Sequence, residues 1–435
     1  MARQAYRASI FHLLGEPPAE DFAASAQHFE DGVLVIEDGH VAELGAWDEV
    51  APRLGGVAVE NFADGLIVPG FVDSHVHYPQ VDIVASRGGQ LLEWLSAYTF
   101  PAEERFHHKD VAAETARFFL DQLLRNGTTT ALVFATAHKV SAEALFEEAL
   151  ARNMRLITGK VLMDRNAPAG ICDTAETGYQ ESRALIRAWH GKGRLGYAVT
   201  PRFALTSSDR QLELAGRLLA EHPGVRLHTH LSENLEENAA VRRLFPDCPD
   251  YFAVYEKFGL ATPHSVFAHC LHLSPDEWAR FGQSGAGVAF CPGSNLFLGS
   301  GLFDLSDAER VGARVGLGTD VGAGASLSLF AAMSDAYKVC QTRQRSLDPM
   351  KLFYLATLGG ARTLGLDDRI GNFETGKEAD FIVLDAKRLP MLARRWTHAA
   401  SLAERLFALA MLGDDRAVSR TYIAGALAYA RDPQS

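Results

Sequence analysis

The chain of 435 residues is poor in cysteine: it has five, at scattered positions, and no two of them form a Cys-x-x-Cys pair. An odd, dispersed set is typical of reduced thiols, so the sequence predicts a cytoplasmic protein without a disulfide framework. Long apolar runs are missing as well, which excludes a membrane-spanning segment. Arg3, Arg7 and His12 interrupt the apolar start of the chain and argue against a signal peptide.

The sequence also has no basic block. Its 42 Lys and Arg residues stand against 54 Asp and Glu residues, and the formal net charge is −12 at pH 7. Because such a chain lacks the positive surface that phosphate backbones and anionic headgroups attract, neither nucleic acid nor a membrane is expected as a partner. With 47% hydrophobic and 22% charged residues, the composition is that of an ordinary soluble globular enzyme.

No Gly-x-Gly-x-x-Gly motif follows any predicted strand, which argues against a doubly wound dinucleotide-binding sheet. Strand patterns alternate with helical patterns instead. Eight strands, each followed by helical material, are predicted at residues 66–77, 128–134, 155–162, 195–200, 225–230, 265–269, 287–290 and 314–318. Eight such repeats predict an α/β fold with a closed (β/α)8 TIM-type barrel.

Both chain ends have the pattern of β structure. A strand is predicted at 6–14, and a hairpin at 32–44 turns at Asp38-Gly39, a dipeptide that suits the tight turns of hairpins. Near the other end, residues 379–384 and a hairpin at 420–429 have strand patterns. We therefore predict a small β-sandwich domain built from residues 1–66 and 375–435, beside a hydrolase barrel of residues 67–374.

The run from Leu66 to His77 ends in two histidines two residues apart. Side chains of a strand alternate between its faces, so His75 and His77 are expected to point the same way. Two imidazoles on one face at a strand end form half of a metal site. The alternative is a hydrogen-bonded core histidine followed by a loop histidine.

Other predicted strands deliver similar residues where they end, which is the edge at which barrel enzymes keep their chemistry. These residues are His230, His269 and Asp320. Spacing alone does not choose between His228 and His230, although His230 lies closer to the strand end. A set of histidines and one aspartate suits one Zn²⁺ per chain, and Fe²⁺ is also compatible.

Two further features have alternative interpretations. Glu233 follows His230 by three residues and is free to transfer protons, or it is a first-turn carboxylate favoured by a helix dipole. The aromatic segment Leu91–Pro101, which contains Trp94, is either a helix packed on the body or a lid over a flat apolar ligand.

Several motifs together resemble the amidohydrolase superfamily: Pro69–His77, His230, His269 and Gly318-Thr319-Asp320. No lysine at a strand end offers a bridge between two metals, so the mononuclear deaminase branch is the closer match. Within it, the chain resembles the guanine deaminase family at residues 77–80, 91–95, 98–101, 200–203, 230–234 and 291–295.

This resemblance implies hydrolytic deamination of guanine to xanthine and ammonia, in purine catabolism or salvage, by a homodimer. It implies metal ligation by His75, His77, His230 and Asp320. Asp320 would also take the proton of the attacking water, His269 would hydrogen-bond that nucleophile, and Glu233 would protonate the ring and the departing amine. The residues expected to bind the substrate are Gln80, Trp94, Arg202, Phe203 and Glu233.

Two other functions remain open at this point. A deaminase of another flat amino-heterocycle, such as an oxidised purine or an aminotriazine, would have the same metal ligands, and Gln80, Arg202 and Phe203 are the residues that would distinguish it. A non-catalytic relative that keeps the fold as a scaffold would be expected to have lost metal ligands, whereas this set is complete.

Overall fold

The computed structural model describes residues 3–18 and 20–432. The chain forms two compact units, one of residues 1–72, 121–130 and 328–435, and one of residues 73–120 and 131–327. The outermost residues of the predicted domain ranges, 1–2 and 433–435, lie outside the described residues. The predicted boundaries at 66 and 374 stay predictions.

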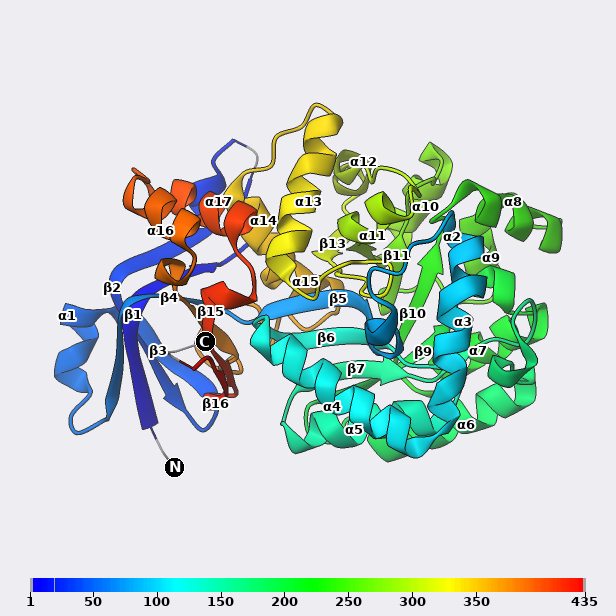
Figure 1. The fold of residues 1–435 in the computed structure, drawn as a ribbon, viewed down its shortest axis with the longest axis horizontal. Coiled ribbons are helices and arrows are strands. Elements are labelled where there is room, and N and C mark those ends of the chain that lie inside the picture. The colour runs from blue at the N-terminus through cyan, green and yellow to red at the C-terminus, as the bar shows by residue number, and fades with distance from the viewer. Residues whose placement is uncertain (1–2, 19, 433–435) are drawn as a thin grey trace. The chain divides into compact units, whose positions relative to one another are not determined.

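The two chain ends build a separate β-sheet, as the sequence predicts (Figure 1). Its strand order is β16-β15-β14-β4-β1-β2-β3, so strands from the C-terminal end lie beside strands from the N-terminal end. The strands are β1 (Arg3–Leu13), β2 (Ala26–Glu37), β3 (His40–Ala46), β4 (Val59–Pro69), β14 (Phe381–Leu384), β15 (Val418–Ile423) and β16 (Ala426–Ala430). Within the part of the chain that the structure describes, these strands form one continuous sheet.

Alternation of side chains gives each face of this sheet its own apolar cluster. Tyr6 packs on one face against Phe381 and Tyr422, with ring centroids 5.0 Å away in both pairs. Its neighbour Ala5 belongs to a different cluster with Val33. The predicted turn between β2 and β3 is confirmed at Asp38-Gly39, where both residues have positive φ angles of 54° and 81°.

The sequence pattern predicted no element between the strand at 379–384 and the hairpin at 420–429. Residues between β14 and β15 form two helices, α16 (Pro390–Thr397) and α17 (Leu402–Leu412). The sequence of α17 is rich in Ala and Leu, which favour helix, and the Ser401 side chain caps it by accepting a hydrogen bond from the N–H of Glu404. A helical signal was therefore present in the sequence.

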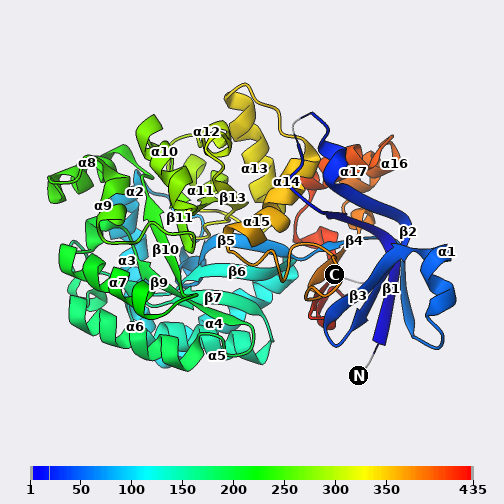
Figure 2. The same ribbon diagram turned by 180° about the vertical axis from the view of Figure 1, so that it is seen from behind.

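The predicted barrel is confirmed as a nearly closed parallel sheet of eight strands surrounded by helices (Figures 1 and 2). In sheet order the strands are β13 (Arg314–Leu317), β12 (Gly287–Phe290), β11 (Ser265–His269), β10 (Arg226–Leu231), β9 (Leu195–Pro201), β7 (Arg155–Gly159), β6 (Thr128–Phe134) and β5 (Phe71–His77), with the short β8 (Val161–Leu162) paired to β9. Between β13 and β5, the N–H of Asp320 donates to the carbonyl of His75 at 2.9 Å.

Helices follow the strands in the order expected of a βα barrel. They are α4 (Lys109–Arg125), α5 (Lys139–Ala151), α6 (Ala175–Trp189), α7 (Asp209–Glu221), α8 (Leu235–Leu244), α9 (Tyr251–Lys257), α10 (Pro275–Ser284), α11 (Pro292–Phe297), α12 (Leu305–Arg310), α13 (Leu329–Thr342), α14 (Pro349–Ala356) and α15 (Leu358–Thr363). The sequence pattern did not predict α9, α11 or α15.

The first predicted barrel strand, 66–77, is two strands that belong to different sheets. β4 ends at Pro69 and pairs with β14, whereas β5 begins at Phe71 and belongs to the barrel. Gly70 separates them, and a Cβ atom there would lie 2.1 Å from Oγ1 of Thr129. Only glycine fits so close an approach, so the chain changes sheets at this residue.

No helix among the described residues is both long and apolar enough to cross a membrane.

Candidate active site

The barrel strands bring the predicted ligands together at one end. His75 and His77 lie at the end of β5, His230 near the end of β10, His269 at the end of β11, and Asp320 three residues after β13. One donor atom each from His75, His230, His269 and Asp320 lies within 4.8 Å of the others, and all four residues are buried.

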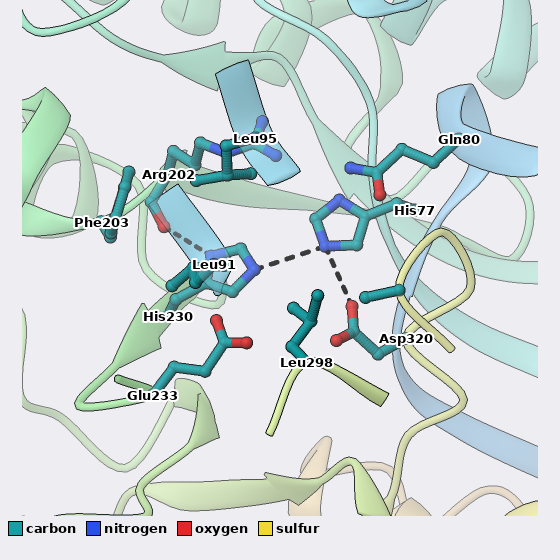
Figure 3. A pocket seen from close by; sticks show the side chains of 11 residues that line it. His77, Gln80, Leu91, Leu95, Arg202, Phe203, His230, Glu233, Leu298 and Asp320 are labelled. Atoms are coloured by element: carbon teal, nitrogen blue, oxygen red, sulfur yellow. Dashed lines mark hydrogen bonds and ion pairs between the residues drawn. The ribbon is translucent and has the colours of Figure 1, made fainter. Parts of the chain in front are cut away.

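His77, the remaining predicted ligand, lies in direct contact with this cluster. Oδ1 of Asp320 is 3.1 Å from Nε2 of His75 and 3.2 Å from Nε2 of His77. Nε2 of His77 is in turn 3.2 Å from Nε2 of His75. It lies 3.3 Å from Nε2 of His230 (Figure 3). Ligands about 2.0–2.1 Å from a tetrahedral Zn²⁺ are about 3.4 Å apart, so these separations fit a metal.

The orientation of the rings supports the same conclusion. Nδ1 of His230 donates to the carbonyl of Arg202 at 2.7 Å, which leaves a lone pair on Nε2 in the neutral ring. That lone pair points towards Nε2 of His77, 3.3 Å away. Nε2 of His269 is buried and has no hydrogen-bond partner among the described residues. Converging lone pairs on buried imidazoles are unfavourable without a cation, so the donor set fits a divalent metal ion.

Burial fixes the charge states of the ligands. It lowers the pKa of His77 to about 3 and the pKa values of His75 and His230 below their ordinary range. For Asp320, burial would raise the pKa, but the nearby imidazoles, above all through the contacts of His75 and His77, hold it well below the usual value. Neutral imidazoles and an ionised carboxylate are the forms that bind metals.

Glu233 lies beside this cluster in a different electrostatic environment. Burial and the charge of Asp320 raise its pKa well above the ordinary value. Its Oε2 is 3.4 Å from Nε2 of His269, and its Oε1 accepts from Oγ of Ser300 at 3.4 Å. A buried carboxyl group with a raised pKa can hold a proton near neutral pH and release it within a reaction.

Glu233 is not the first-turn carboxylate of the alternative interpretation. Helix α8 begins at Leu235 with Asn234 as its N-cap, and its first-turn acids are Glu236 and Glu237. The carboxylate of Glu237 accepts from the backbone N–H of Glu233 at 2.9 Å and thereby holds the backbone that carries this side chain.

The backbone at two of the predicted site residues is in a conformation that L residues rarely adopt. His269 has a φ of 74° and Asp320 a φ of 47°. The His269 ring is then held by Asn295, whose Oδ1 lies 2.8 Å from its Nδ1. Backbone strain of this kind is concentrated at sites where function needs a particular direction of the side chain.

A pocket opens beside the histidine cluster (Figure 3). Its apolar walls suit a flat ring, and its polar groups lie on two sides, with Gln80 and Arg202 near one another and Glu233 apart from them. The lining residues are His77, Gln80, Leu91, Leu95, Arg202, Phe203, His230, Glu233, Leu298, Asp320 and Ala323.

Arg202 and Gln80 both bind a residue that the sequence analysis did not single out. Nη1 of Arg202 donates to both carboxylate oxygens of Glu103, at 2.9 and 2.8 Å. Nε2 of Gln80 donates to Oε1 of Glu103 at 3.0 Å. All three side chains are buried. Glu103 belongs to α3 (Phe100–Glu104), so its only sequence signal was its place just after the Leu91–Pro101 segment.

Comparison with known proteins gives the family. The model of the amidohydrolase family matches residues 66–428. The chain belongs to the amidohydrolase family. This amidohydrolase is 49% identical to the guanine deaminase of Escherichia coli (strain K12) over 95% of its own length and 94% of the relative's. It is 37% identical to the guanine deaminase of Mus musculus over 82% of each chain.

Solved structures of such relatives share the fold. The structure of E. coli guanine deaminase superposes with a TM-score of 0.97 at 48% identity, covering 99% of this amidohydrolase and all of that chain. The guanine deaminase of C. acetobutylicum, with guanine bound in its active site, gives a TM-score of 0.91 at 28% identity, covering 98% of this chain and 100% of the other.

The structure places Trp94 differently from the other predicted substrate-binding residues. Trp94 is buried in an apolar cluster, its Nε1 donates to the carbonyl of Ser86 at 3.3 Å, and it is not one of the pocket-lining residues. Its neighbours Leu91 and Leu95 line the pocket instead. The segment is helical, running through α2 (Leu91–Trp94), a π-helical turn η4 (Leu95–Thr99) and α3.

Two further side chains support the ligands of this amidohydrolase. Nε2 of His228 lies 2.7 Å from Nδ1 of His75, so His228 orients the ring of a proposed ligand. Asp73 accepts from the N–H of Thr319 at 3.0 Å and from its hydroxyl at 2.5 Å, next to Asp320. A local sequence pattern does not reveal either contact, because the partners are far apart in the chain.

Proposed function

We propose that this amidohydrolase hydrolyses guanine to xanthine and ammonia. The observation that carries the proposal is the pocket itself, in which Gln80 and Arg202 lie on one side, Gln80 beside His77, and Glu233 lies on the other. The guanine deaminases at 49% and 37% identity support it, as does the bound guanine of the C. acetobutylicum structure.

A metal ion completes the proposed site. His75, His77, His230 and Asp320 are the residues that would hold it. When bound, a divalent ion would lower the pKa of water and make a nucleophile available at neutral pH. We propose one Zn²⁺ per chain, with Fe²⁺ as the alternative, because imidazole and carboxylate donors suit both.

The protein's own groups supply the proton transfers. Addition of water at C2 of guanine forms a C–O bond, and loss of ammonia breaks the C2–N bond, so water and guanine yield xanthine and ammonia. Asp320, an ionised carboxylate, would accept a proton from the water. His269, whose Nε2 lies 3.8 Å from Oδ2 of Asp320, would hydrogen-bond the oxygen of that water. Glu233 starts protonated and gives its proton to the ring nitrogen beside C2. The resulting carboxylate then takes the proton of the new C2 hydroxyl and passes it to the departing amine. The proton held by Asp320 finally returns Glu233 to its protonated form.

Arg202 and Gln80 give the pocket its preference for guanine. A guanidinium has only donors, which suit O6 and the neighbouring ring acceptor of guanine but not the 6-amino group of adenine. Gln80, three residues after His77, reads the ring edge nearest the histidines. Phe203 lines the pocket where it can cover the ring face.

The proposal also covers the compartment, the oligomeric state and the pathway of the protein. We propose a cytoplasmic homodimer that acts in purine catabolism or salvage. All five cysteines are free, which supports a reducing compartment. The dimer and the pathway rest on the family resemblance.

The decisive experiment is incubation of the zinc-loaded protein with guanine while xanthine is followed by its ultraviolet absorbance. Ammonia release from adenine, an oxidised purine and an aminotriazine should be slow in the same assay. Ammonia from one of those bases and none from guanine would favour a deaminase of another flat amino-heterocycle. No release from any base would favour the non-catalytic scaffold.

A further inference from the structure

Glu103 has no part in the chemistry proposed above, yet its carboxylate is wholly buried, with 0% of the residue exposed. Removing a carboxylate from water is costly unless it is paired and hydrogen-bonded. The side-chain partners that satisfy Glu103 are Arg202, through two contacts of Nη1, and Gln80, through Nε2. Both partners line the pocket, whereas Glu103 does not.

The contact to Gln80 decides which end of its amide a ligand meets. A glutamine amide has a donor end and an acceptor end of nearly equal size. Because a carboxylate only accepts, Nε2 must face Glu103, which leaves Oε1 as the free end. The Gly322 backbone confines that oxygen, since a Cβ atom at Gly322 would lie 1.9 Å from it. Glu103 therefore turns Gln80 into an acceptor.

The contact to Arg202 leaves a hydrogen-bond donor facing the pocket, whereas the contact to Gln80 leaves an acceptor. Nη1 is committed to Glu103, and the remaining N–H groups of the guanidinium keep their donor capacity. The carboxylate also compensates the positive charge, so Arg202 acts as a directional donor rather than a bare cation. The ion pair holds one end of the guanidinium in place, because both oxygens of Glu103 contact Nη1.

We propose that Glu103 is a positioning residue that sets the donor and acceptor pattern of the pocket, through Gln80 and Arg202 together. The inference deepens the proposed function and rests on it. Glu103 should therefore govern how well the base binds in the right orientation, and the proton transfers at Glu233 and Asp320 should depend on it much less.

The test is Glu103→Gln, which keeps the size of the side chain. It replaces one acceptor oxygen by a donor and removes the compensating charge, so Gln80 and Arg202 each lose their fixed orientation. We expect KM for guanine to rise at least ~10-fold while kcat changes less than ~3-fold. The control is Glu277→Gln: Glu277 is also buried, but it caps α10 through Ser274, and its substitution should leave both constants unchanged.

A double-mutant cycle separates positioning from general destabilisation. Glu103→Gln should raise KM by a smaller factor in a Gln80→Ala background than in the wild type, because the group it orients is gone. Equal factors in both backgrounds, or a loss of kcat with KM unchanged, would overturn the proposal. If Glu103→Gln fails to fold, Glu103→Asp serves instead. It keeps the charge but shortens the side chain, and it should likewise raise KM while kcat changes little. Failure of the wild type to deaminate guanine would reject the proposed function instead, before any variant is compared.

Discussion

Glu233 combines a high pKa with a place beside an ionised Asp320, which is how two nearby carboxyl groups acquire different roles. Glu233→Gln keeps the size and hydrogen bonding of the side chain but cannot transfer protons. We expect kcat to fall by at least ~10² while metal content and melting temperature stay nearly unchanged. Steady-state kinetics measures kcat, metal analysis the metal content, and thermal unfolding the melting temperature. A variant that retains its kcat would assign the proton transfers to Asp320 alone.

The buried ion pair changes what a substitution of Arg202 does. Arg202→Ala should cost ~2–4 kcal/mol in kcat/KM for guanine, because O6 loses its charged donor. It should also lower the melting temperature, since the Glu103 carboxylate is left buried and unpaired. The double variant Arg202→Ala/Glu103→Ala should recover stability but not activity. Unchanged kinetics in the single variant would show that Arg202 does not read the base.

At the scale of elements, the loop after β13 shapes the pocket through one glycine. Gly322 has a φ of 125°, and a Cβ atom there would strike the Gln80 amide at 1.9 Å. Gly322→Ala should therefore displace Gln80 and raise KM for guanine at least ~10-fold. Gly191→Ala is the matched control, because Gly191 also has a positive φ, of 76°, but nothing lies within 4 Å of its added Cβ. Similar KM values for the two variants would contradict this role of the loop.

Strand β1 contains a histidine that makes the fold sensitive to acid. His12 is buried in its neutral form: Nε2 donates to Oε1 of Gln27 at 2.7 Å, and Nδ1 accepts from the N–H of Phe373 at 3.2 Å. Burial lowers its pKa to about 4. As pH falls below the unfolded value near ~6.5, the unfolded chain takes up this proton first, so stability falls.

Urea unfolding measures this pH effect. Between pH 7 and pH 5 the wild type should lose ~2 kcal/mol more unfolding free energy than His12→Gln, whose side chain does not titrate. Equal pH slopes in the two proteins would show that His12 is protonated without cost in the folded state.

The elements that could be predicted from sequence are those whose signal is local. The buried parallel strands are continuous apolar or β-branched runs, as in Thr128–Phe134. Several of them end at or near a polar residue, as β5 does at His77 and β11 at His269. Long-range contacts could not be predicted. Glu103 meets Arg202 across 99 positions, and nothing in the sequence around either residue shows the pairing. The division at Gly70 depends on Thr129 in the same way.

At the scale of the whole molecule, the ligand cluster gives the simplest prediction. Chelation should abolish activity, and one equivalent of Zn²⁺ should restore it, because the described ligands form one cluster. Zinc should also raise the melting temperature in a concentration-dependent way, since the ion binds the assembled site more strongly than the unfolded chain. Full activity in rigorously metal-free protein would contradict the metal assignment.

The hydrogen bonds between Asp73 and Thr319 join positions 246 residues apart, at the place where the first and last barrel strands deliver their ligands. During synthesis, the His75–His77 pair leaves the ribosome long before Asp320 has been translated. A growing chain can offer a metal ion only two imidazoles at that stage, and two neutral donors bind weakly and exchange readily. The proposed four-ligand site is therefore complete only after translation has passed the last barrel strand, and we expect the ion to bind firmly only from that point on.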